Sequence, residues 1–108
     1  MLEYAIPHPG TIVQNWSEDH PGLDFACVRG TPVFAAHSGE LTKGYNGRMG
    51  NYAYVTNDET RTYYAHLRAV APTGWYEEGE MIGTCGSTGS WSTGPHLHFE
   101  SDKPFRFK

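Results

Sequence analysis

The stretch His96-Leu97-His98-Phe99-Glu100 alternates polar and apolar side chains. A period of two is the pattern of a β-strand with one buried face, so we expect Leu97 and Phe99 to face the core and both imidazoles to share the opposite face with Glu100. Two neutral imidazoles side by side make half of a zinc site. On alternation alone, such a pair is more often ordinary solvated surface.

The rest of the chain also favours strands over helices. Thirteen glycines and seven prolines are spread over 108 residues, so no helical pattern of ordinary length survives between them. Short segments rich in β-branched and aromatic residues predict strands at residues 11–14, 23–27, 33–36, 39–43, 52–56, 62–66, 81–84 and 96–100. We therefore expect an all-β fold, a small antiparallel β-sheet domain in the form of an open sandwich or barrel.

Two predicted loops are too long for simple hairpins. They lie at residues 44–51 and 86–95, and each carries an aromatic side chain, Tyr45 and Trp91. Long loops on a rigid sheet commonly form the walls of binding sites. We expect a groove between them, with Tyr45 and Trp91 either lining it for substrate binding or completing a small aromatic core.

Length and charge limit the possible functions. A chain of 108 residues allows one domain, spanning 1–108. Twelve acidic and eight basic residues give a net charge of −4, so we expect no nucleic-acid or anionic-membrane partner. We also expect a monomer. The first residues lack the basic and apolar regions of a secretory signal, and no apolar run is long enough to cross a membrane. Export by a leader of its own is therefore not expected.

The two cysteines give no sign of a metal site. Cys27 and Cys85 have no Cys-x-x-Cys neighbour, although they could form one disulfide. Disulfides persist mainly in proteins that reach oxidising compartments, and the chain shows no secretion signal. We therefore expect two buried free thiols.

Four histidines besides the His-x-His pair differ in their surroundings. In His20-Pro21-Gly22-Leu23-Asp24, the proline and glycine argue against a helix, and in an extended segment residues 20, 22 and 24 share a face with room for a cation. With one histidine of the pair, His20 and Asp24 would complete a three-ligand zinc site; a turn ion pair is the alternative. His66 is a third strand histidine, or a satisfied half-buried one. His8 and His37 lack such partners, and we expect surface positions for both.

Several short motifs in chain order resemble one known family, the lysostaphin-type, LytM-like zinc metallopeptidases. The resemblance runs from about Gly10 to Glu100. The motifs are His20-Pro21-Gly22-Leu23-Asp24-Phe25-Ala26, Gly30-Thr31-Pro32-Val33-Phe34-Ala35-Ala36, Gly50-Asn51-Tyr52, Tyr64-Ala65-His66-Leu67, Ile82-Gly83, Ser87-Thr88-Gly89 and Thr93-Gly94-Pro95-His96-Leu97-His98-Phe99-Glu100.

The resemblance implies an antiparallel β fold with an open groove, one zinc ion per chain, and hydrolysis of peptide bonds in bacterial peptidoglycan, in the stem peptide or the cross-bridge. It implies that His20, Asp24 and His98 bind the zinc, and that His66 and His96 are catalytic without binding it. Such an enzyme would act on the bacterial cell wall in lysis or remodelling. The chain departs from some relatives in lacking a tyrosine within residues 14–19.

Two other functions remain open on the sequence. The first is a non-catalytic, zinc-containing module that binds the cell wall, against which both catalytic histidines argue. The second is a lipoyl or biotinyl carrier domain, but Lys43 before Gly44 lacks the context of a modified lysine. The origin is also open between a phage-encoded lysis or tail protein and a catalytic domain of a longer chain.

Overall fold

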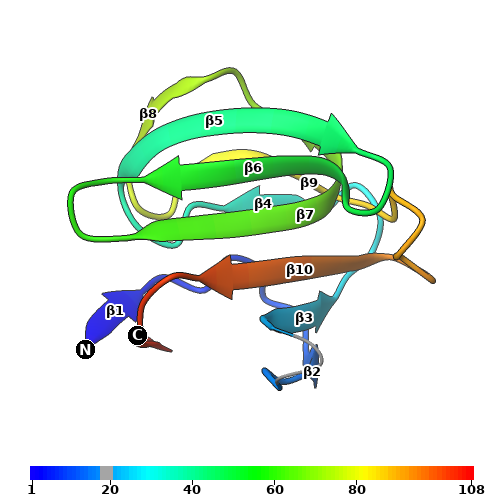
Figure 1. The fold of residues 1–108 in the computed structure, drawn as a ribbon, viewed down its shortest axis with the longest axis horizontal. Coiled ribbons are helices and arrows are strands. Elements are labelled where there is room, and N and C mark those ends of the chain that lie inside the picture. The colour runs from blue at the N-terminus through cyan, green and yellow to red at the C-terminus, as the bar shows by residue number, and fades with distance from the viewer. Residues whose placement is uncertain (18–20) are drawn as a thin grey trace.

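The computed structural model describes residues 1–17 and 21–108, and this part of the chain contains strands and no helix (Figure 1). It therefore includes no helix long and apolar enough to cross a membrane. The strands are β1 Leu2–Tyr4, β2 Ile12–Gln14, β3 Leu23–Ala26, β4 Pro32–Phe34, β5 Gly39–Asn46, β6 Gly50–Thr56, β7 Arg61–Val70, β8 Gly74–Tyr76, β9 Met81–Cys85, β10 His96–Ser101 and β11 Phe105–Phe107.

Most strands belong to one antiparallel sheet that stays open at its edges. Its main order is β2-β3-β10-β7-β6-β5-β8, and β9 pairs with both β7 and β4. In Figure 1, β10 lies between β3 and β7, and β6 lies between β7 and β5. The two terminal strands, β1 and β11, pair in parallel as a separate small sheet. The predicted all-β, antiparallel and open fold is confirmed.

Strand alternation decides which face of the sheet is buried. On β10, Leu97 and Phe99 are fully buried, and on the neighbouring β7 Tyr64 is buried with them. The side chains of His96 and His98 therefore take the opposite face, as their alternation predicts. The core thus lies behind the sheet, and the histidines are left on its open face.

All eight predicted strands form, with ends that differ by a few residues. The three strands that were not predicted, β1, β8 and β11, have only three residues each, too few to show alternation. β5 also continues to Asn46 and β6 begins at Gly50, so the predicted long loop 44–51 is a short hairpin turn. The long strands belong to the central sheet and give the clearer signal.

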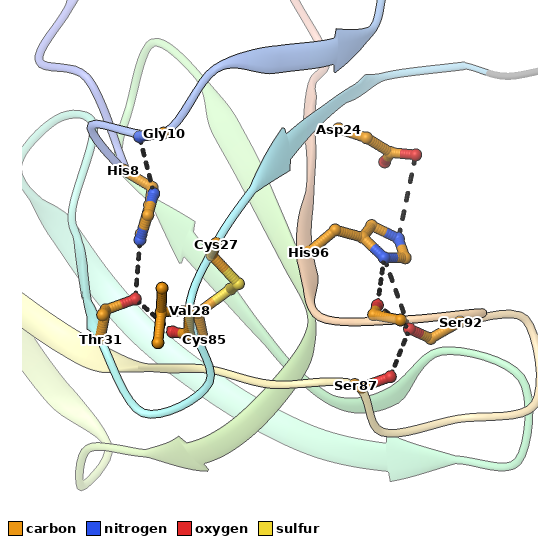
Figure 2. The surroundings of a disulfide bond; sticks show 11 residues. His8, Gly10, Asp24, Cys27, Val28, Thr31, Cys85, Ser87, Ser92 and His96 are labelled. Atoms are coloured by element: carbon orange, nitrogen blue, oxygen red, sulfur yellow. Dashed lines mark hydrogen bonds and ion pairs between the residues drawn. A yellow bond between two sulfur atoms is a disulfide. The ribbon is translucent and has the colours of Figure 1, made fainter.

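The interpretation of the cysteines as free thiols is wrong, because Cys27 and Cys85 form a disulfide (Figure 2). Cys27 directly follows β3 and Cys85 ends β9, and the fold brings their Cα atoms within 6.5 Å. The bond therefore joins two strands that are far apart in sequence. In Figure 2 it lies between the pair His8 and Thr31 on one side and the pair Asp24 and His96 on the other.

The expected surface positions of His8 and His37 are also wrong, since only 5% and 7% of these residues are exposed. His8 accepts the backbone N–H of Gly10 on Nδ1 and donates from Nε2 to Thr31 Oγ1. Burial lowers the pKa of both histidines. A turn sequence alone could not show this, because Thr31, the partner of His8, and Thr62, the partner of His37, are distant in the chain.

His37 ends a chain of hydrogen bonds that a neutral imidazole completes. Its Nδ1–H donates to the Ser38 carbonyl, which leaves Nε2 to accept the Thr62 hydroxyl at 2.9 Å. Thr62 then accepts from the Tyr64 hydroxyl at 2.7 Å, and Tyr64 accepts the N–H of Ala36. With a proton on Nε2, Thr62 would accept from His37 as well as from Tyr64, and its own buried hydroxyl proton would lose this acceptor.

We expect the free energy of unfolding to fall as the pH is lowered below about 6.5. The unfolded chain binds a proton at His37 that the folded state resists, because burial lowers the folded pKa. One such histidine contributes a slope of up to about 1.4 kcal/mol per pH unit. Urea unfolding from pH 7 to 5 measures it, and His37→Gln should have a shallower slope than the wild type. Equal slopes would contradict the assignment of the pH dependence to His37. His8 is present in both proteins and contributes to the slope of each.

Candidate active site

Two of the predicted zinc ligands lie in contact on adjacent strands. Asp24 on β3 is the register partner of His98 on β10, so the two side chains share a face. Asp24 Oδ1 lies 2.9 Å from His98 Nδ1, and both side chains are largely buried. The third predicted ligand, His20, lies outside the described residues.

Glu100 holds the other nitrogen of the same imidazole. Its Oε2 lies 2.6 Å from His98 Nε2, as the shared strand face predicts. Burial by itself would lower the pKa of His98, but the hydrogen bonds to Asp24 and Glu100 raise it to about 9. Two carboxylates around one imidazole favour positive charge here, which a proton or a metal cation can supply. With a cation on the Nδ1 side, Nε2–H would donate to Glu100 and fix the ring.

His66 occupies an irregular point of β7. The register between β6 and β7 shifts between Tyr64 and Leu67, across this residue, and its φ of 62° lies in a region that non-glycine residues rarely adopt. Its backbone N–H donates to Met49 O, and Nδ1–H donates to Thr88 O at 2.7 Å. Burial lowers its pKa, so the ring is neutral at pH 7 and Nε2 carries the lone pair. Strain of this kind is found at functional sites.

His96 has the same tautomer for a similar reason. Its Nδ1 donates to the backbone carbonyl of Gly94 at 2.9 Å, and Nε2 lies 3.8 Å from Asp24 Oδ2 (Figure 2). The ring centroids of His66 and His96 are 4.7 Å apart. Two imidazoles with basic Nε2 atoms therefore stand side by side next to the pair formed by Asp24 and His98.

Hydrogen bonds join turn 46–50 to loop 86–92 beside His66. Backbone N–H groups of the loop, including that of Trp91, donate to carbonyls of the turn at 2.8 and 3.0 Å. Gly89 has a φ of 90°, and a Cβ there would overlap the backbone of the turn. The same loop presents the Thr88 carbonyl to the β7 histidine. The sequence signal for this contact is the glycines in Ser87-Thr88-Gly89 and Gly50-Asn51. The sequence does not show that these two segments meet.

The two predicted aromatic residues lie in different places. Trp91 is 63% exposed, lies beneath the Arg48 guanidinium at 5.0 Å, and lines the histidine pocket. Tyr45 lines another pocket, with Lys43 and Arg68, so the structure does not bring it to the histidines. The histidine pocket has a volume of about 320 Å³, and its lining residues are Gln14, Pro21, Asp24, Met49, His66, Trp91, Thr93, His96, His98 and Glu100.

Known proteins share this sequence and fold. Peptidase family M23 matches residues 18–105. The chain is 45% identical over 85 residues to the peptidoglycan DD-endopeptidase ShyC of Vibrio cholerae, which covers 75% of this chain and 19% of ShyC. It resembles the catalytic domain of the antimicrobial peptidase lysostaphin from Staphylococcus simulans, with a TM-score of 0.72, 34% identity, and coverage of 85% of this chain and 74% of that one.

A zinc-containing peptidase from Vibrio cholerae gives a TM-score of 0.78 at 28% identity and covers 91% of this chain and 33% of the other. The chain spans about a fifth of the length of the curated relatives it matches. The family match includes every residue predicted to bind zinc or to be catalytic. The resemblance to lysostaphin-type, LytM-like peptidases is thereby confirmed, and this chain belongs to peptidase family M23.

Proposed function

We propose that residues 1–108 form one catalytic domain, a zinc-dependent metalloendopeptidase that hydrolyses peptide bonds in bacterial peptidoglycan. The observation that carries the proposal is a single pocket in which Asp24 contacts His98 beside two imidazoles whose Nδ1 atoms are held by backbone carbonyls. The ligands Asp24 and His98 alone would also suit a structural metal site. Two basic nitrogens beside it, on His66 and His96, are what hydrolysis needs.

The donor set fits one zinc ion. A carboxylate oxygen and an imidazole nitrogen are ligands that zinc prefers, and Asp24 and His98 place them 2.9 Å apart. With His20 as the third ligand, a fourth position would stay open, as in catalytic zinc sites. Bound zinc supplies a Lewis acid that polarises the scissile carbonyl and makes water more acidic. Glu100 would keep the His98 ring in place from its far nitrogen.

The histidines next to the metal ligands move the protons. Nε2 of either His66 or His96 can take the proton of the attacking water and return it to the leaving amine. The lowered pKa of His66 keeps it in the basic form at neutral pH. The other imidazole can donate to the developing oxyanion when it enters the reaction as an imidazolium, with its Nε2 proton taken from solvent. Trp91, on the wall of the pocket, would contact the substrate peptide.

We place the activity at the bacterial cell wall. ShyC is named as a peptidoglycan DD-endopeptidase, and the disulfide of Cys27 and Cys85 suits an oxidising, extracytoplasmic environment. A role in lysis and a role in remodelling are both compatible with this chemistry. Mass spectrometry of the fragments released from peptidoglycans with different cross-bridges would identify the bond that is cut.

The proposal is tested by removing and restoring the metal. We expect close to one zinc per purified chain, loss of peptidoglycan hydrolysis in a chelator, and recovery with added Zn²⁺. Zinc content is measured by elemental analysis and hydrolysis by release of soluble fragments. Undiminished hydrolysis by the metal-free protein would contradict the mechanism. Zinc binding without hydrolysis of any peptidoglycan would instead indicate a wall-binding module.

A further inference from the structure

A cluster of tyrosines lies on the same face of the sheet as Asp24 and His98, on the strands beyond them. The register pairs Tyr54 on β6 with Tyr63 on β7, and Tyr63 with Glu100 on β10. Directly opposed residues in an antiparallel sheet share a face, so both tyrosines lie on the face of Glu100 and His98. Tyr52, two residues before Tyr54, lies on this face as well.

The tyrosines contact one another and reach the site already described. The ring centroids of Tyr54 and Tyr63 are 4.7 Å apart, and Tyr52 lies 5.6 Å from Tyr63 and 5.8 Å from Tyr54. Tyr63 in turn lies 6.4 Å from the ring of His98. All three tyrosines are only half-buried, and none belongs to the hydrophobic core. The cluster therefore adjoins the histidine pocket through the contact of Tyr63 with His98, and it is partly open to solvent.

Tyr52 lies across the neighbouring strand. A Cβ on Gly44 of β5 would overlap the ring and hydroxyl of Tyr52, so the absence of a side chain at Gly44 makes room for this ring. The ring thus packs against the backbone of β5. Tyr52 is about 10 Å from His98, two strand spacings away. About three extended peptide residues cover that distance.

The charges near the cluster do not suit an anionic ligand. Glu100 lies at one side, and Glu40, which is two residues from the partner of Tyr54, lies on the same face. Among the described residues, a cation in contact with the cluster is Arg61, which stacks on Tyr54 at 4.1 Å. The hydroxyl and acetamide groups of a sugar are neutral, so a glycan strand over the tyrosines would meet no like-charge repulsion from these carboxylates. The apolar face of an aromatic ring is suited to packing against the C–H groups on the face of a sugar ring.

We propose that Tyr52, Tyr54 and Tyr63 form a saccharide subsite that binds the glycan strand of peptidoglycan while the attached stem peptide lies in the histidine pocket. The proposal rests on the proposed function for the identity of the polymer. A stem peptide extended from the point of cleavage would bring its sugar end over the tyrosines, given the spacing across the sheet. Arg61 would then donate to sugar or acetamide oxygens at the edge of the cluster.

The test separates glycan binding from hydrolysis. Wild-type protein is titrated with peptide-free glycan strands and with N-acetylglucosamine hexamer by calorimetry, and we expect binding to both. Tyr52→Leu and Tyr54→Leu keep apolar area but lose the aromatic face, and each should weaken binding by about fivefold. Tyr52→Phe keeps the ring and is the matched control, which should bind within about twofold of wild type.

The same variants are assayed on intact peptidoglycan and on a cross-linked peptide without sugars. We expect a higher KM on intact peptidoglycan, unchanged kcat/KM on the peptide, and unchanged zinc content. No binding of either glycan by the wild type would overturn the proposal. An equal loss on both substrates would overturn it too, and would assign the tyrosines to the peptide. Glycan binding without hydrolysis of either substrate would refute the proposed function and not the subsite.

Discussion

Replacement of His98 by alanine is expected to abolish both zinc binding and hydrolysis, whereas His96→Ala should keep the zinc and lose at least about 100-fold in turnover. The two histidines share one face of β10 but have different partners. His98 lies between Asp24 and Glu100, and His96 is held by a backbone carbonyl with Nε2 towards the pocket. Losing one of three ligands empties the site, while losing a proton carrier slows the reaction.

Zinc content and rates of the purified variants decide this prediction. His66→Ala is the matched comparison on another strand, and it should behave like His96→Ala, with zinc retained and turnover lost. Circular dichroism would show that each variant is folded. Loss of zinc in His96→Ala with retention in His98→Ala would mean that ligand and catalyst have been assigned in reverse.

Removal of the disulfide is expected to lower the free energy of unfolding by about 4 kcal/mol. Cys27 and Cys85 are separated by 58 residues, and the crosslink restricts the unfolded chain over that whole loop. Gly86, directly after Cys85, accepts the backbone N–H of His96 on its carbonyl oxygen, so loop 86–92 begins at the crosslink. The loss of stability is therefore accompanied by loosening of this loop and lower activity under reducing conditions.

Urea unfolding with and without a reductant measures the effect. The double variant Cys27→Ala with Cys85→Ala serves as the control, because its midpoint should match the reduced wild type and should not respond to the reductant. An oxidised wild type no more stable than the double variant would contradict the prediction. Thiol titration of the unfolded, non-reduced protein would then show whether the bond is present.

The predictions from sequence were right where a pattern repeats within one segment. Alternation in His96–Ser101 predicts both the strand and the faces of its side chains, because the pleat of a strand is a local property. The density of glycine and proline likewise excludes long helices without any knowledge of contacts. The three-residue strands β1, β8 and β11 escaped prediction, since they depend on pairing with distant strands.

The all-β class and the side of β10 that carries the imidazoles follow from local patterns in the sequence, and the resemblance to a family supplies the residues proposed for the site. The tertiary structure decided what depends on contacts between distant segments. It joined Cys27 to Cys85, buried His37, placed Tyr45 away from the histidines, and clamped loop 86–92 to turn 46–50. Each of these depends on the strand order, which brings segments dozens of residues apart into contact and which no single segment of the chain shows.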